Sequence, residues 1–347
     1  MQIRFLLGPA GSGKTHRCLA EIREALHKDA AGSPLILLAP KQATFQLERQ
    51  LLTSQRLPGY TRLHILSFER LAEFIFEKLG RPVPKLLAEE GRVMVLRALL
   101  EQKRGDLKLF RASARLPGFA RQLSQLLREL QQYHLTPARL ENLAGKVGSA
   151  NRLNAKLEDL ALILRAYADW LEAHKLQDAD CFLDLATQAL KARGMTTDSQ
   201  MALSPHEERA GRELERGGFD PNTSSPQPSP PAALGREGET TTRRTQLPSP
   251  ECVMTSGCAL NLQLGGLWLD GFAQMTPQER QLLAAVTRCS PQTTLAFCLD
   301  EPKQSPPWHS LWAPVMETFQ RCRDELGALP DASVDVELLP RNPAQSR

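Results

Sequence analysis

The chain has 347 residues, of which 41% are hydrophobic and 24% charged, and its formal net charge is +4. This length is enough for two domains, or for one domain with a large insertion, and the charge permits a nucleic-acid partner without demanding one. No apolar run approaches the ~18 residues that cross a bilayer, and the apolar run before Gly8 is too short for a secretory signal, so we expect a cytoplasmic protein. The seven cysteines are scattered without a C-x-x-C pair, which favours reduced thiols over disulfides or a metal cage.

A glycine-rich turn lies near the start of the chain, between an apolar run at 3–7 and a helical pattern at 15–28. It fills every fixed position of the spacing G-x-x-x-x-G-K-[ST]. Glycines without Cβ atoms let successive backbone N–H groups surround an anion, and the helix N-terminus adds partial positive charge. We therefore predict a phosphate-binding loop for ATP. Its binding residues are Gly8, Gly11, Ser12, Gly13, Lys14 and Thr15, with Lys14 at the β- and γ-phosphates and the Thr15 hydroxyl on Mg²⁺.

Two further strand–helix units follow this loop. The apolar block within 34–40 is typical of a strand buried on both faces, and 41–52 has a helical pattern. A third strand is expected at 63–66, with Ser67 as the N-cap of a helix at 68–79. Three such units in about 80 residues predict an α/β fold with a parallel sheet.

Only helical patterns are found between about 84 and 190. Thr136-Pro137 combines an N-cap with proline at the first helical position. One stripe keeps four–three spacing over almost three heptads, and it consists of Leu153, Leu157, Leu160, Leu164, Tyr167 and Leu171. We interpret this stripe as the internal packing face of an all-helical subdomain that interrupts the sheet; a dimerising coiled coil is the alternative.

Basic residues gather in the first part of this helical block. Such a surface can neutralise DNA phosphates, although the solvated face of ordinary helices is the simpler reading. Aromatic side chains for stacking single-stranded bases are sparse there, with only Phe110 and Phe119. The candidates for DNA binding are Arg97, Lys103, Arg104, Lys108, Arg111 and Arg115.

The segment 195–261 differs in composition from the rest of the chain. From Met195 to Pro250 it is rich in Pro, Ser, Thr, Gly, Arg and Glu and has no Ile, Val, Trp, Tyr or Cys. Such a composition buries too little apolar surface to offset the entropy of ordering. We predict a disordered, low-complexity insertion, and we expect its deletion over 196–250 to leave folding and nucleotide affinity unchanged.

Strand and helix patterns return after this insertion. Strands are expected at 266–270, 293–299 and 334–339, with helices at 276–289 and 308–326. Asp270 ends the first of these strands, which suits the Asp that holds Mg²⁺ in phosphate-loop enzymes; an ordinary strand-end turn is the alternative.

The carboxylates needed for rapid chemistry are missing from their usual places. Gly271 follows Asp270 where a catalytic Glu commonly stands, and Glu279 is expected on a helix. We therefore expect Mg·ATP to bind and to be hydrolysed slowly or not at all. Three tripeptides match the D/E-x-K pattern of nucleases, but they are predicted in helices or turns rather than on neighbouring strands: 101–103, 106–108 and 301–303. No catalytic residue is assigned.

Four later motifs, in order after the Gly8–Thr15 loop, resemble one family. They are Pro40–Glu48, Leu66–Ala72, Leu269–Phe272 and Thr276–Glu279. Over roughly 1–190 and 262–330 the chain resembles the N-terminal part of the B subunit of AddAB-type helicase–nucleases.

The resemblance implies a RecA-like, superfamily 1 helicase-like lobe with a helical subdomain inserted in it. The lobe would comprise 1–83 and 262–347, around the subdomain 84–194 and the insertion 195–261. Gln42 joins the nucleotide-binding candidates through the first of the four motifs. In the family this lobe is not the motor, and the B subunit works with a motor-bearing A subunit on double-stranded DNA ends for recombination. The family's second lobe and nuclease domain have no counterpart in this sequence. A stand-alone phosphate-loop kinase or ATPase for a small molecule, or a decayed fragment, is the alternative.

Overall fold

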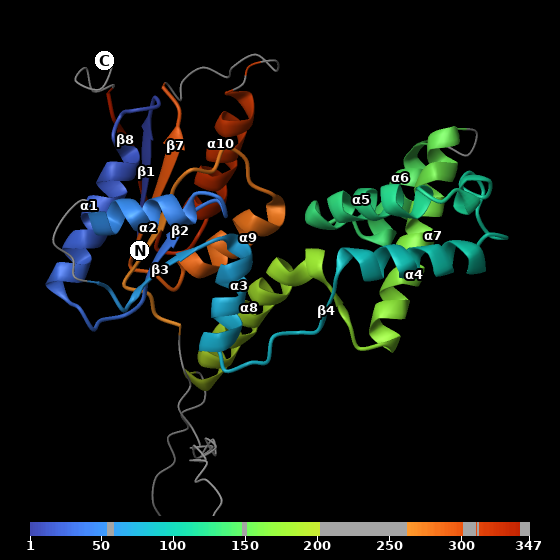
Figure 1. The fold of residues 1–347 in the computed structure, drawn as a ribbon, viewed down its shortest axis with the longest axis horizontal. Coiled ribbons are helices and arrows are strands. Elements are labelled where there is room, and N and C mark those ends of the chain that lie inside the picture. Colours follow the sequence, from blue (N-terminus) through green and yellow to red (C-terminus); the bar gives the residue numbers. More distant parts are fainter. Residues whose placement is uncertain (54–58, 148–150, 202–261, 301–309, 311, 341–347) are drawn as a thin grey trace, which may run out of the picture. The chain divides into compact units, whose positions relative to one another are not determined.

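The computed structural model describes residues 1–53, 59–147, 151–201, 262–300, 310 and 312–340 (Figure 1). Within these residues six of the strands form one sheet in which every strand pair is parallel. The order across the sheet is β3-β2-β6-β7-β1-β8. The α/β fold with a parallel sheet is thus confirmed. The strands are β1 (Gln2–Gly8), β2 (Leu35–Leu38), β3 (Leu63–Leu66), β6 (Gly266–Leu269), β7 (Gln292–Cys298) and β8 (Ser333–Leu338).

The strand order places the late part of the chain in the middle of the sheet. β6 pairs with β2 on one side, with Leu35 opposite Gly266, and with β7 on the other. β7 and β8 then flank β1, so that Phe5 lies opposite both Leu295 and Val336. The helical residues between β3 and β6 therefore interrupt the sheet, as the sequence predicted.

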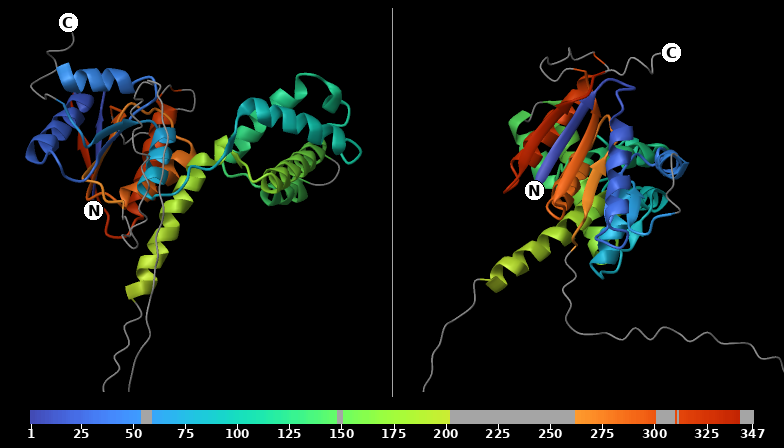
Figure 2. Two further views of the ribbon diagram at one scale, coloured as in Figure 1. Left: turned by 60° about the horizontal axis from the view of Figure 1, so that its bottom comes forward. Right: turned by 90° about the vertical axis from the view of Figure 1, so that its left-hand side faces the viewer.

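Side chains alternate between the two faces of the sheet, as the twofold period of a strand requires. On β1, Phe5 and Leu7 belong to a core with the helices of one face, whereas Leu6 belongs to a core with the helices of the other. The first face carries α3 (Phe68–Lys78), α8 (Phe182–Met201), α9 (Pro277–Thr287) and α10 (Ala313–Gly327), and the second carries α1 (Lys14–Lys28) and α2 (Thr44–Thr53) (Figure 2).

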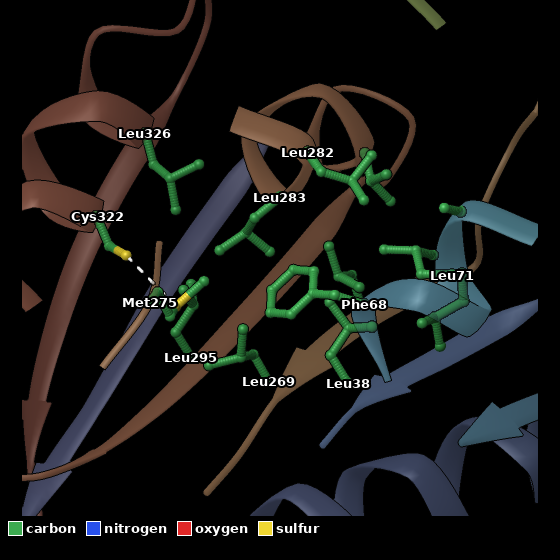
Figure 3. Close-up of a cluster of buried hydrophobic side chains, with 14 of the residues drawn as sticks. Leu38, Phe68, Leu71, Leu269, Met275, Leu282, Leu283, Leu295, Cys322 and Leu326 are labelled. Atoms are coloured by element: carbon green, nitrogen blue, oxygen red, sulfur yellow. Dashed lines mark hydrogen bonds between the residues drawn. The ribbon is translucent and has the colours of Figure 1, made fainter. Parts of the chain in front are cut away.

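The core of the first face packs strand ends against helix starts. Phe68, the first residue of α3, lies among the side chains of Leu38, Leu269 and Leu283 (Figure 3). Met275 reaches α10, where its sulfur lies 4.0 Å from that of Cys322. This packing fixes the loop after β6, which carries the candidate metal residue Asp270.

Two helices of the sheet lobe begin with a side-chain cap, and the predicted cap Ser67 is one of them. The Ser67 hydroxyl accepts from the Arg70 N–H at the start of α3. Thr276 and Glu279 form a reciprocal capping box at the start of α9, with Pro277 at the first helical position. These side chains satisfy N–H groups that a helix start leaves without partners.

The helical block has its own core. The stripe on α7 (Arg152–Ala173) is buried at Leu160, Leu164, Tyr167 and Leu171, while Leu153 is 47% exposed. The stripe packs within the chain, which agrees with the subdomain interpretation. The other helices of the block are α4 (Glu89–Gln102), α5 (Phe119–Gln132) and α6 (Pro137–Val147), with short 3₁₀ turns at Ser113–Arg115 and Ala179–Cys181.

A two-stranded parallel pair in this block was not expected. β4 (Leu86–Leu87) pairs with β5 (Gln177–Asp178), because the chain enters and leaves the helical block at the same place. Two residues per strand are too few to give a period in the sequence, so helical patterns alone were expected there.

Several element boundaries differ from the sequence prediction. α2 begins at Thr44 rather than 41, because the N–H of Ala43 bonds to the carbonyl of Pro40 and closes a turn. α10 begins at Ala313, and residues 308 and 309 of its predicted start lie outside the described part. α8 continues to Met201, past the predicted start of the insertion at 195, since 195–201 contains neither Pro nor Gly. The rest of the predicted insertion lies outside the described residues.

Candidate nucleotide site

The turn between β1 and α1 has the backbone that its glycines were expected to provide. Gly11 and Gly13 have φ of +79° and +86°, in the left-handed region that favours glycine. A Cβ at either position would meet nothing within 4 Å, so conformation rather than space requires glycine there. Gly8 is constrained by space, because a Cβ would lie 2.5 Å from the carbonyl oxygen of Leu339.

Lys14 is buried inside this turn, with 8% of its surface exposed. Its Nζ donates to the carbonyl oxygens of Gly8 at 2.8 Å and Pro9 at 2.7 Å, and to Ser12 Oγ at 3.1 Å. The ammonium group is thus held at the centre of the loop by three neutral oxygens. Since none of these three oxygens belongs to a carboxylate, a phosphate oxygen can replace one of them with a gain in charge pairing.

The two residues predicted for the metal lie against each other. Thr15 Oγ1 donates to Asp270 Oδ2 at 2.6 Å, although the two are 255 residues apart in the chain. β6 places Asp270 there, and the Asp270 N–H continues the strand pairing by bonding to the carbonyl of Leu38. The structure therefore places Asp270, at the end of its strand, next to the Gly8–Thr15 loop.

Burial raises the pKa of Asp270, while hydrogen bonds from Thr15 and the Gly271 N–H, and the charge of Lys14, lower it. The net direction is upward, so the carboxylate is incompletely compensated. Buried acids with a raised pKa are common at functional sites, and Asp270 contacts Thr15, which lines a cavity.

The donor set fits a magnesium ion held jointly with phosphate. The described residues contain no group of three or more His, Cys, Asp or Glu side chains that could hold a metal. Mg²⁺ usually keeps several waters and takes one or two protein oxygens together with substrate phosphates. One hydroxyl and one carboxylate next to an anion-binding turn match that requirement.

A cavity of about 520 Å³ opens beside the turn. Its walls come from the turn, from α1 and from α2, and the lining residues are Gly11, Gly13, Lys14, Thr15, His16, Leu19, Arg23, Gln50 and Thr53. Gln42 is exposed in the turn before α2 and is not among these residues, so its nucleotide role stays a prediction. Five of the lining residues were not predicted from the sequence: His16, Leu19, Arg23, Gln50 and Thr53. Helical spacing from Thr15 could have indicated those on α1, whereas nothing in the sequence indicates that α2 approaches α1.

Glu279 has a structural role that accounts for its position. Its carboxylate accepts from the N–H of Thr276 at 2.7 Å and from the Thr276 hydroxyl at 3.2 Å. Burial raises its pKa. Its position in the first turn of α9 confirms the prediction that Glu279 lies on a helix.

The basic candidates of the helical block are partly paired. Arg97 donates to the carbonyl of Pro117, Arg104 pairs with Glu101 at 3.0 Å, and Lys108 pairs with Glu158. Arg111 and Arg115 are exposed, and Lys103 is half-buried. The buried Asp159 accepts the N–H groups of Lys108, Leu109 and Phe110 and so fixes the loop that carries the tract.

No helix in the described part of the chain combines the length and apolar character of a membrane span. Comparison with known proteins identifies a family.

A family model described as "ADDB, N-terminal" matches residues 5–206 and 261–338. The match omits 207–260, within the segment whose composition differs from the rest of the chain.

Relatives agree with this family match. The B subunit of the ATP-dependent helicase/deoxyribonuclease of Symbiobacterium thermophilum is 31% identical over 99% of this chain, and that of Pelotomaculum thermopropionicum is 32% identical over 92%. The corresponding protein of Desulforamulus reducens is 39% identical over 55% of the chain. The aligned part is 24%, 22% and 16% of these relatives, so the chain spans about a quarter of their length or less. The chain therefore belongs to the family of AddB N-terminal regions.

Proposed function

We propose that this chain is the nucleotide-binding N-terminal portion of a helicase–nuclease B subunit, with a RecA-like phosphate-loop lobe. Its family and the names of its relatives support a role in DNA repair and recombination. In this role it binds Mg·ATP and works beside a motor-bearing A subunit on double-stranded DNA ends.

The contact between Thr15 and Asp270 carries the nucleotide part of this proposal. It combines a hydroxyl, a carboxylate and the buried ammonium of Lys14 at the mouth of one glycine-rich turn. Lys14 would bind the β- and γ-phosphates and Thr15 and Asp270 the Mg²⁺ ion, which would neutralise phosphate charge.

The same site supports slow hydrolysis or none. A carboxylate that polarises water usually follows the metal-binding Asp, and Gly271 occupies that position. Glu279 is held in the α9 cap. ATP would then act as a bound ligand that stabilises the lobe rather than as fuel.

DNA binding is assigned to the exposed part of the basic tract. Arg111 and Arg115 are exposed, so their charges can meet phosphates without first losing a buried partner. Lys103 lies near them in sequence and is half-buried.

Equilibrium binding of Mg·ATP to the wild-type chain and to Lys14→Ala tests the proposal, together with phosphate release measured with and without blunt duplex DNA ends. We expect binding that the variant loses, and phosphate release that stays slow. Equal affinities would remove the assigned role of Lys14. Rapid turnover with a small acceptor and without DNA would instead make the protein a stand-alone kinase.

A further inference from the structure

The cavity beside the Gly8–Thr15 loop extends well beyond the phosphate-binding turn. On α1 its lining runs from Thr15 through His16 and Leu19 to Arg23, which is one face of the helix over two turns. Eight residues at the rise of an α-helix correspond to about 12 Å. This length is comparable with the distance from the β-phosphate to the base in an extended nucleotide.

The α2 side of the cavity has side chains suited to a base and a sugar. Gln50 and Thr53 of α2 each carry groups that donate and accept hydrogen bonds, so they can pair with the polar edge of a base or with ribose hydroxyls. Leu19 supplies buried apolar surface between the helices. The planar groups of His16 and Arg23 can stack on an aromatic ring.

The described residues of the lining include basic side chains and no acidic ones. Lys14 and Arg23 are cationic, and none of the described residues that line the cavity is an Asp or a Glu. A volume of about 520 Å³ is also that of an ordinary small-ligand site. The charge, the length and the polar side chains of the lining therefore fit one class of occupant, an anion with a nucleoside attached.

We propose that the groove between α1 and α2 binds the nucleoside part of a nucleoside triphosphate whose phosphates lie on the Gly8–Thr15 loop. α2 thereby becomes part of the nucleotide site, with Gln50 as its principal contact. The inference rests on the proposed function, because the loop must first hold the phosphates.

A matched pair of variants on α2 isolates this groove. Gln46 and Gln50 are both exposed glutamines one turn apart, but only Gln50 lines the cavity. Gln50→Trp puts a large side chain into the groove. Gln46→Trp makes the same substitution on the same helix but outside the groove, so it controls for effects on α2 itself. Each variant, the wild type and Lys14→Ala are titrated with Mg·ATP and with magnesium tripolyphosphate, which has the phosphates without the nucleoside.

We expect Gln50→Trp to weaken Mg·ATP by at least about tenfold and to leave tripolyphosphate within about twofold, which is the signature of lost nucleoside contacts. Gln46→Trp should bind both as the wild type does, and Lys14→Ala should lose both. Unchanged ATP affinity in Gln50→Trp, or an equal loss of tripolyphosphate, would overturn the inference. If the wild-type protein binds tripolyphosphate as tightly as ATP, the nucleoside groove is ruled out, but the phosphate-binding loop is still supported. Wild-type protein that binds neither would overturn both proposals.

Discussion

Two regions of this molecule bury a charged side chain, and they do so in opposite ways. In the helical block Arg92 is 2% exposed and donates to Ser124, Asp178 and Asp180. In the sheet lobe Asp270 is 8% exposed, and its carboxylate accepts from the neutral hydroxyl of Thr15. A buried charge with matched opposite charges stabilises architecture, whereas one that is incompletely compensated beside a cavity is suited to a ligand.

The network around Arg92 extends beyond one pair. Asp180 also accepts from Arg128, which in turn pairs with Glu89, so that α4, α5 and the turn before α8 share one set of charges. Gln278 of α9 donates to the carbonyl of Asp180 at 2.9 Å and to the carboxylate of Asp184 at 2.8 Å. The polar centre of the helical block thus bonds to a helix of the sheet lobe.

Removing Arg92 tests the architectural half of the comparison and has the largest expected effect. Arg92→Ala leaves the carboxylate of Asp178 buried without its partner, and we expect the free energy of unfolding to fall by about 3–5 kcal/mol. Denaturant titration measures this loss. Arg165→Ala is the control, because Arg165 pairs with Glu141 in the same block at an exposed site and should cost less than about 1 kcal/mol. Similar losses in the two variants would contradict the structural role assigned to Arg92.

Removing Lys14 tests the other side of the comparison, the assignment of the Gly8–Thr15 loop to ligand binding. Its ammonium bonds to neutral oxygens within the turn, so Lys14→Ala should affect Mg·ATP far more than folding. Loss of charge-assisted bonds to two phosphates predicts an affinity roughly 100-fold lower, measured by calorimetry. Lys28→Ala, at the exposed end of the same helix, should bind normally. A variant that loses stability but not affinity would place Lys14 with Arg92 rather than with the ligand site.

Neutralising Asp270 separates stability from binding. Its pKa is raised from the ordinary value of 3.8, so the folded state holds the proton more tightly than the unfolded state does. The stability from this group is therefore present at low pH and lost as pH rises through the raised pKa. Asp270→Asn should have a higher Tm than the wild type in the absence of nucleotide, by a margin that grows as the pH rises from the ordinary pKa towards the raised pKa and is constant above it. A margin that shrinks as pH rises would reverse the sign of this argument.

The same substitution removes a metal ligand. We expect Asp270→Asn to lower the gain in ATP affinity that Mg²⁺ provides by about tenfold, which calorimetry with and without Mg²⁺ measures. ATP binding without the metal should change little. If both conditions weaken equally, Asp270 contacts the nucleotide rather than the ion.

The basic tract gives the smallest expected effect. Arg111→Ala and Arg115→Ala should each weaken duplex DNA binding by about threefold and reduce the slope of log affinity against log salt by about 1. Arg104→Ala serves as the control, because Glu101 already neutralises that charge. Fluorescence anisotropy at several salt concentrations measures both quantities, and an unchanged slope in all three variants would assign the tract to the solvated surface.

The candidate site was predictable where a short local pattern determines the geometry. The spacing of Gly8–Thr15 dictates a turn before a helix, and the apolar run before Asp270 places that carboxylate at a strand end. The contribution of Gln50 and Thr53 to the cavity could not be predicted from the sequence, because it depends on how α2 packs near α1 in the tertiary structure.

Charge counts were a weaker guide than local spacing. The cluster of basic residues in the helical block was identified without Glu158, which is distant in sequence but pairs with Lys108. Arg92 looked like any helical arginine because its partner Asp178 is 86 residues away. The parallel sheet was predictable from three strand–helix units, but its order was not, since strand order depends on contacts across the whole chain.

The position of β1 between β7 and β8 has a consequence for synthesis on the ribosome. Of the six strands of the sheet β1 is translated first, and its first neighbour, β7, emerges only about 290 residues later, as with the bond from Arg4 to Thr294; β8 follows about 40 residues after that. At usual translation rates that interval is roughly 15–60 s. During it the apolar face of β1 has neither flanking strand, and the nascent chain is then a natural client for a chaperone.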